Sequence, residues 1–223
     1  MKKCSNDKLE KSVISKKAFQ LAEHETTVEA FEIFIENTGY ITDAEKNIGE
    51  FLACNDYPKD IQDTVGSSKN WRSPGFAQSA NHPVVCVSYR DVEAYINWLN
   101  TKNGKNYRLP TSEEWLSVYG KKTTKNCTDG GIGLVYDLCP GTYGTFEVKH
   151  FAANEFKLFD MNGNVQEWVQ TCRDNCKTHL IYGDSIKLEP TQFDPCKDYS
   201  KNNDFRSSDL GFRLAIDTFD NPQ

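Results

Sequence analysis

The side chains of this chain that are best suited to chemistry are its eight cysteines, at positions 4, 54, 86, 127, 139, 172, 176 and 196. The number is even and higher than a cytosolic protein of this length usually carries, which is compatible with an oxidising compartment. Cys172 and Cys176 are spaced like half of a zinc site, but no second Cys or His pair follows at a suitable spacing and His179 stands alone. The spacing therefore favours a structural disulfide or a free thiol over a metal ion.

Oxygen donors form the second candidate group, between Asp160 and Glu167. These two carboxylates enclose an Asn-Gly-Asn segment, residues 162–164, and a tight turn there would supply the backbone carbonyls of Gly163 and Val165. Hard cations such as Ca²⁺ take carboxylate and carbonyl oxygens as ligands. The alternative is an Asx turn followed by a glutamate on the surface.

Three helices are predicted to position these groups. The first begins at Thr26–Glu29, which has the pattern of a capping box, and ends at Gly39, a suitable C′ residue. The second is capped at Ser88–Asp91, and the third begins with a capping box formed by Thr111 and Glu114. The apolar residues that give the first two helices a buried stripe are Ala30, Phe31, Phe34, Ile35, Val92, Tyr95, Ile96 and Leu99.

From about residue 120 to the end, the sequence has only short extended pieces separated by Gly, Asn, Asp and Pro. Two to three helices followed by short strands and many loops indicate an α+β fold. The length of 223 residues suits one domain. We therefore expect a single domain over residues 18–219, preceded by a flexible N-terminal segment, residues 1–17.

The composition excludes some partners. With 26 Lys and Arg against 32 Asp and Glu, the net charge is −6, and no segment concentrates basic residues as nucleic acid binding requires. No window approaches the ~18 apolar residues of a membrane span. The segment Cys4-Ser5-Asn6, followed by polar residues, is similar to the mature start of a bacterial lipoprotein. This predicts an extracytoplasmic or cell-surface location with a lipid anchor through Cys4, and an ordinary flexible N-terminus on a cytoplasmic protein is the alternative.

Six segments that are separated along the chain resemble the formylglycine-generating-enzyme (sulfatase-modifying-factor) family, and they occur in the family order. They are Thr38–Glu45, Asn70–Phe76, His82–Tyr89, Tyr107–Trp115, Phe159–Trp168 and Leu210–Leu214. Together they cover nearly the whole chain from about residue 18 to 216. The resemblance implies a C-type-lectin-like fold with many loops, held in part by structural calcium.

The resemblance also implies where calcium would bind. Position by position, Asp160, Gly163, Val165 and Glu167 match the second calcium site of the family. A first site would use side chains and carbonyls within a divergent loop, namely those of Asn126, Cys127, Asp137 and Cys139.

The sequence departs from the enzymes of this family at the copper site. Those enzymes oxidise a substrate cysteine with copper held by two thiolates, five residues apart, shortly after a Gly-Gly-Ser segment. The corresponding segment here is Tyr182–Ile186, which places Leu188 and Phe193 at the thiolate positions. Copper(I) needs soft sulfur ligands, so copper and the oxidase chemistry are not expected. Other catalytic motifs are missing too: there is no Gly-x-Ser-x-Gly elbow, phosphate loop or dinucleotide fingerprint, and the four histidines are scattered.

The segment from about residue 182 to 209 strays most from the family pattern, and a divergent loop surface on a stable scaffold is typical of binding sites. Aromatic anchors beside adaptable polar side chains suit recognition. The predicted ligand-binding residues are Ile186, Leu188, Glu189, Gln192, Phe193, Asp194, Tyr199, Asn202, Asn203 and Phe205.

The hypothesis is therefore a non-catalytic binder of an unknown protein or glycan. The variable proteins of diversity-generating retroelements share this fold and vary just before a Gly-Phe-Arg motif, which occurs here at Gly211–Arg213. Neutral drift with buried aromatic side chains would give the same pattern. The alternatives are a copper-dependent oxidase that converts a peptide cysteine to formylglycine, with Cys172, Cys176 or Cys196 rearranged into a copper pair, and a purely structural or regulatory domain.

Overall fold

The computed structural model describes residues 19–46, 54, 69–120, 144–185, 193–194 and 197–218. Several predictions concern residues outside these ranges. They are the N-terminal segment with Cys4, the first calcium site at Asn126, Cys127, Asp137 and Cys139, and the ligand-binding residues Ile186, Leu188, Glu189 and Gln192.

Helix α1 spans Val28–Thr38 and ends at Gly39, whose φ of 64° is the left-handed conformation predicted for this cap. Its N-cap differs from the prediction. The Thr27 side chain caps the helix by accepting from the N–H of Ala30, at 3.2 Å. Thr26 cannot serve as the cap because its backbone is engaged in two other hydrogen bonds. Its N–H donates to Phe212 O at 2.9 Å, and its carbonyl accepts from the N–H of Val84 at 2.9 Å.

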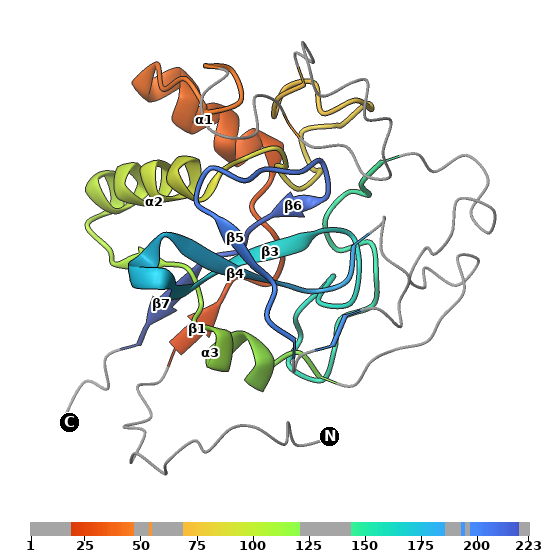
Figure 1. The fold of residues 1–223 in the computed structure, drawn as a ribbon. Coiled ribbons are helices and arrows are strands. Elements are labelled where there is room, and N and C mark those ends of the chain that lie inside the picture. Colours follow the sequence, from red (N-terminus) through yellow and green to blue (C-terminus); the bar gives the residue numbers. More distant parts are fainter. Residues whose placement is uncertain are drawn as a thin grey trace.

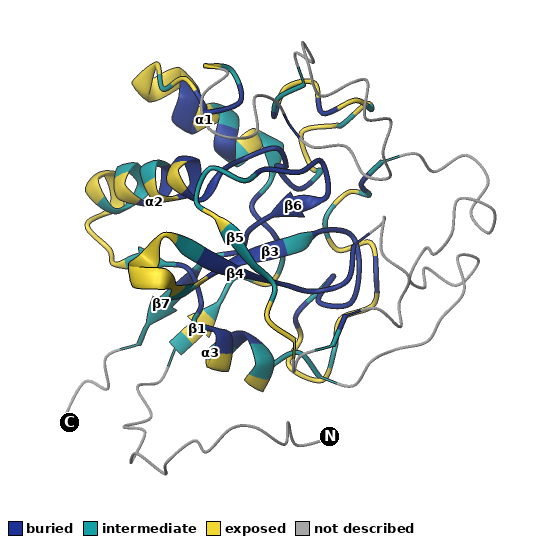
Figure 2. Cartoon of the chain, in the orientation of Figure 1, coloured by how far each residue is buried: buried dark blue, intermediate teal, exposed yellow. Residues whose placement is uncertain are grey.

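Helices α2 (Tyr89–Asn103) and α3 (Ser112–Ser117) begin as predicted. Each has a complete capping box, formed by Ser88 with Asp91 for α2 and by Thr111 with Glu114 for α3. The predicted stripe of α2 faces the core (Figure 1, Figure 2). The α+β prediction with two to three helices is confirmed.

The strands form two small sheets. The first has the order β1-β7-β2 and is antiparallel, and its members are β1 (Phe19–Leu21), β7 (Ala215–Asp217) and β2 (Tyr107–Arg108). The second has the order β5-β4-β3-β6, with β3 and β6 parallel and the other pairs antiparallel. Its members are β3 (Gln166–Arg173), β4 (Thr178–Tyr182), β5 (Ser200–Asn202) and β6 (Leu210–Gly211).

The main core lies between the two long helices and the second sheet (Figure 2). Aromatic rings dominate it; for example, Tyr95 of α2 contacts Phe31 and Phe34 of α1 and also Phe212, at centroid distances of 5.5 to 5.8 Å. Gly211 is required at its position, because a Cβ there would lie 2.7 Å from the Val84 carbonyl oxygen. The Gly-Phe-Arg segment is therefore part of the scaffold. Gly211 lets the backbone approach Val84, the Phe212 ring packs in the core, and the Arg213 side chain is fully buried.

None of the described helices is long and apolar enough to cross a membrane.

Candidate functional site

A buried ion pair lies at the end of the predicted calcium segment, and we call its surroundings the acidic centre. Glu167 stands on β3 and Arg213 follows β6, and their side chains are 1% and 0% exposed. Arg213 donates to both Glu167 oxygens, from Nε at 2.9 and 2.8 Å and from Nη2 to Oε1 at 2.7 Å. Trp115 of α3 adds its indole N–H to Oε2 at 2.7 Å. The alternative of a surface glutamate is therefore wrong, since Glu167 joins three segments in the interior.

These hydrogen bonds limit the capacity of Glu167 to act as a ligand for a cation. An ionised carboxylate has about four lone-pair positions, and each Glu167 oxygen already accepts two donors. A cation could take Glu167 as a ligand only in exchange for a bond to Arg213 or Trp115.

Asp160 fits an oxygen-ligated cation better. Its two oxygens accept the backbone N–H groups of Phe151 and Lys149, at 2.8 and 2.5 Å, so each keeps lone-pair capacity. Gly163 and Asn164 form the predicted tight turn, with φ of 145° and 58°. In the same turn, the side-chain oxygen of Asn162 is buried and has no hydrogen-bond partner among the described residues. A buried acceptor of this kind is a suitable further ligand.

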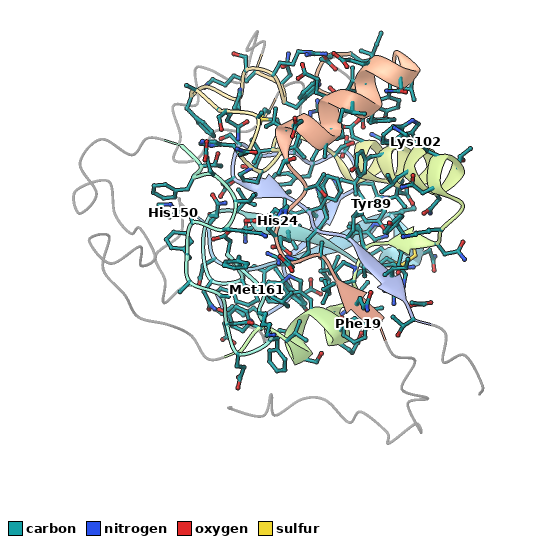
Figure 3. The ribbon with its side chains drawn as sticks, turned by 180° about the vertical axis from the view of Figure 1, so that it is seen from behind. Phe19, His24, Tyr89, Lys102, His150 and Met161 are labelled. Carbon is teal, nitrogen blue, oxygen red and sulfur yellow. A yellow bond between two sulfur atoms is a disulfide. The ribbon has the colours of Figure 1, made fainter. Side chains whose placement is uncertain are left out.

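A third carboxylate, Glu25, reaches this centre from the loop before α1. The loop before α1 runs beside the start of the predicted calcium segment, since the N–H of Phe159 donates to Glu23 O at 2.8 Å. Figure 3 labels His24 in the loop and Met161 in the calcium segment. Glu25 is 0% exposed; its Oε1 accepts from the Asn164 amide at 3.2 Å, and its Oε2 has no partner in the part of the chain that the structure describes.

Burial raises the pKa of Glu25 well above its ordinary value of 4.5, and the nearby Asp160 carboxylate raises it further. Burial also raises the pKa of Asp160. The centre thus has three carboxylates and one guanidinium, an excess of acidic groups. Sequence reasoning missed Glu25 because a glutamate in a polar loop before a helix reads as a surface residue.

Neutralising Glu25 is expected to remove a destabilising ionisation. Because its folded-state pKa is raised, the stability contributed by the protonated form is complete below about pH 4.5 and is lost as the pH rises through the folded-state pKa. Glu25→Gln should therefore melt at a higher temperature than the wild type at pH 8, but not at pH 4. Thermal unfolding in a chelator at both pH values measures this, with the exposed Glu36→Gln as control. A wild-type advantage at pH 8 would contradict it.

The predicted ligand-binding residue Phe193 is a core side chain in this structure. Its ring is 5% exposed and contacts the rings of Trp115, Tyr119, Tyr182 and Tyr199, at centroid distances of 5.6 to 5.9 Å. The rings that contact Phe193 come from α3, the segment directly after it, β4 and the segment before β5. The ring can meet a partner only by leaving this cluster.

The remaining predicted binding residues lie around β5. Asn202 is exposed on this edge strand, while Tyr199 and Phe205 are half-buried against the core. Lys201 lies over the Phe205 ring, with its ammonium 5.1 Å from the centroid. Asp194 is partly buried, and its backbone N–H donates to the Tyr199 hydroxyl at 3.0 Å.

Asn203, another predicted ligand-binding residue, has its side chain engaged within the protein. It donates to the Cys176 carbonyl at 3.0 Å, and its oxygen lies 2.7 Å from His179 Nδ1. The Asn203 amide therefore links the β3–β4 hairpin to the end of β5. This role could not be read from the spacing along the chain.

The four cysteines within the described ranges form two disulfides, Cys54–Cys86 and Cys172–Cys176. The second resolves the choice that the sequence left open between a disulfide and a free thiol. His179 is not alone in the structure: a ring nitrogen and the two sulfur atoms of Cys172 and Cys176 all lie within 4.8 Å of one another.

Comparison with known proteins places these features in a wider context. The profile of the sulfatase-modifying factor enzyme 1-like domain matches residues 4–218. The formylglycine-generating enzyme of Mycobacterium tuberculosis is 30% identical over 202 residues, which cover 71% of this chain and 65% of that protein. The inactive C-alpha-formylglycine-generating enzyme 2 of Bos taurus is 33% identical over 119 residues, or 44% of this chain and 38% of that protein. Against the bovine formylglycine-generating enzyme, the match covers 48% of that protein, so the chain spans about half to two thirds of the length of these two relatives.

Two solved structures have a similar fold. PvdO from Pseudomonas aeruginosa superposes with a TM-score of 0.68 at 21% identity, covering 90% of this chain and 80% of that chain. Treponema denticola variable protein 1 superposes with a TM-score of 0.63 at 18% identity, covering 90% and 84%.

Proposed function

This chain belongs to the sulfatase-modifying factor enzyme 1-like family and has its C-type-lectin-like fold, and we propose that it is a non-catalytic, ligand-binding member. The observation that carries the proposal is Phe193, whose ring is buried among aromatic side chains. Counted from the Tyr182–Ile186 segment, this residue falls at a copper-thiolate position of the enzymes. Copper(I) is held by soft sulfur ligands, and a phenylalanine side chain supplies none. That a relative is named inactive supports the same conclusion.

The proposed contact surface is the β5 surface, residues 197–205 in the described part of the divergent segment. It lies on an edge strand of the second sheet and combines the exposed Asn202 with a Lys201–Phe205 pair. Polar side chains beside half-buried aromatic rings are typical of recognition surfaces. The ligand class is a protein or a glycan.

The absence of oxidase activity is tested directly. Protein loaded with copper(I) is incubated with a cysteine-containing peptide, and aldehyde formation is followed by hydrazide capture and mass spectrometry. We expect no product above the copper-only background, because no thiolate stands at position 193. The M. tuberculosis enzyme serves as positive control, and Cys172→Ser/Cys176→Ser tests whether that pair has replaced the usual ligands. Product formation by the wild type would establish the alternative, a formylglycine-generating oxidase.

Binding is tested on a glycan array with wild type and Lys201→Glu in parallel. Lys201→Glu should weaken the binding of each glycan that the wild type recognises. Lys102→Glu on α2, far from β5 in sequence and labelled in Figure 3, should leave that binding unchanged. Glycan binding that is unchanged in Lys201→Glu would exclude the β5 surface as the binding site. A genomic search for a template repeat and an adjacent reverse transcriptase tests the narrower proposal of a retroelement-diversified protein.

Calcium is the proposed structural cofactor of the segment from Asp160 to Glu167. Support comes from the spare lone pairs of Asp160, the buried oxygen of Asn162, and the excess of acidic groups around Arg213. A bound cation would supply positive charge to this centre.

Calcium at about 100 times its dissociation constant should raise the free energy of unfolding by about 2.7 kcal/mol. The expected result is a higher melting temperature in millimolar Ca²⁺ than in a chelator, with a smaller increment for Asp160→Asn. The exposed Asp198→Asn is the control, for which the increment should equal that of the wild type. Identical melting curves with and without Ca²⁺ would remove the proposal.

The location is also a proposal. The Cys54–Cys86 and Cys172–Cys176 disulfides support display outside the cytoplasm, where such bonds persist.

A further inference from the structure

The tip of the β3–β4 hairpin gathers side chains that the proposed binding function does not use. Residues 173–177 are exposed there (Figure 2), and the sulfur atoms of Cys172 and Cys176 lie near the ring of the buried His179. The three potential ligand atoms lie within 4.8 Å of one another, and among the described residues no other group of three cysteine, histidine or carboxylate side chains was found this close.

A hydrogen bond to Asn203 fixes the tautomer of His179. Asn203 Nδ2 donates to the Cys176 carbonyl, which directs the amide oxygen of Asn203 toward Nδ1 of His179. An amide oxygen only accepts, so Nδ1 carries the proton and Nε2 keeps its lone pair. The ring is also stacked on Tyr89, with centroids 3.5 Å apart (Tyr89 is labelled in Figure 3). Metal-binding histidines are held in this way by a polar partner on the other ring nitrogen.

We propose that reduction of the Cys172–Cys176 disulfide creates a site for a borderline-soft divalent cation such as Zn²⁺, with Cys172, Cys176 and His179 as ligands. A dithiol reductant supplies two electrons and two protons: its own thiols become a disulfide, and Cys172 and Cys176 become thiols. Binding of Zn²⁺ then releases the two thiol protons, and the two thiolates balance the charge of the ion. Water completes the tetrahedron, as in other Cys₂His sites.

The required movements are small. With Zn–S bonds near 2.3 Å and tetrahedral angles, the two sulfur atoms would lie roughly 3.8 Å apart, and the three ligand atoms already lie within 4.8 Å of one another. The turn that the disulfide closes has positive φ at three successive non-glycine residues, Asp174, Asn175 and Cys176. This short exposed turn joins the two cysteines, so it is the part of the chain that would adjust when their sulfur atoms separate.

Reduction would reach this disulfide before the other described one. Cys176 is exposed at the hairpin tip, whereas Cys54 and Cys86 are 4% and 0% exposed. The site is separate from the Phe193 position and does not depend on the ligand proposed above.

The test compares wild type and Cys172→Ser/Cys176→Ser, each reduced with dithiothreitol and desalted without oxygen. Zn²⁺ is titrated in competition with a chromophoric chelator, and Co²⁺ is added separately to record thiolate-to-metal absorption. We expect reduced wild type to bind one equivalent of Zn²⁺ more than the reduced double variant, which carries the same other cysteines. Oxidised wild type should lack that equivalent.

Two further variants test the assigned roles. His179→Gln should weaken the additional equivalent, and Asn203→Ala, which removes a positioning partner, should weaken it by about 10- to 100-fold. Equal Zn²⁺ uptake by reduced wild type and the double variant would overturn the proposal, as would the absence of additional cobalt–thiolate absorption. The double variant alters only the exposed hairpin, so this comparison decides the matter even if His179→Gln fails to fold.

Discussion

Arg213→Met is expected to lower the free energy of unfolding by about 3–5 kcal/mol, because removing one partner of a buried ion pair leaves the other uncompensated. Here Glu167 would lose its guanidinium, and the buried carboxylates of Glu25 and Asp160 would lose the positive charge that lowers their pKa values. For a chain of this size, the melting temperature should fall by on the order of 10 °C.

A matched substitution on the surface separates the effect of burial from the effect of losing an arginine. Arg173 and Asp198 form an ion pair at 3.5 Å, but their side chains are 49% and 53% exposed. Arg173→Met should therefore cost about 0–1 kcal/mol. Thermal and denaturant unfolding of the two variants measures the contrast, and equal losses would show that the Glu167–Arg213 pair is not the buried electrostatic centre described above.

The pH dependence gives a second readout of the same variant. Arg213 lowers the pKa of Glu25, so its removal should raise that pKa further. A raised folded-state pKa means that stability is lost as the pH rises. Arg213→Met should thus be least stable, relative to wild type, at high pH.

Cys54→Ser/Cys86→Ser is expected to lower the free energy of unfolding by about 4 kcal/mol, from the loop-closure entropy of a disulfide between residues 32 apart. The bond also anchors Cys86, whose φ is 63° and whose N–H donates to the Ser207 carbonyl at 3.0 Å. Its loss therefore loosens the contact between this loop and the segment before β6.

The hairpin disulfide supplies the matched control, since Cys172 and Cys176 are only 4 residues apart. The same entropy relation gives about 2 kcal/mol for Cys172→Ser/Cys176→Ser. Denaturant unfolding without reductant should give a clearly lower midpoint for the Cys54–Cys86 variant. A midpoint that falls as far, or further, for the hairpin variant would contradict the loop-length argument.

The helices were predictable from sequence because caps and stripes depend on residues no more than four positions apart. The capping boxes at Ser88–Asp91 and Thr111–Glu114 are confirmed. The predicted cap of α1 is one residue too early, since Thr26 and Thr27 are equally able to cap. Only the backbone hydrogen bonds of Thr26 to Phe212 and Val84 distinguish the two residues.

The candidate sites depend on partners far apart in the chain, which the sequence could not reveal. Glu167 read as a metal ligand or a surface residue, yet Arg213, 46 residues away, holds both of its oxygens. Phe193 read as an exposed anchor because an aromatic residue in a loop shows no periodicity from which its burial could be judged.

The sequence by itself determined the family, the α+β architecture, the three helices, and the absence of cysteine at positions 188 and 193. Only the tertiary structure decided that Glu25 joins the acidic centre, that Phe193 is buried, and that His179 lies beside two sulfur atoms. The physical reason is that local backbone preferences act over a few residues. Desolvation and the pairing of buried charges, by contrast, depend on which distant segments the fold brings together.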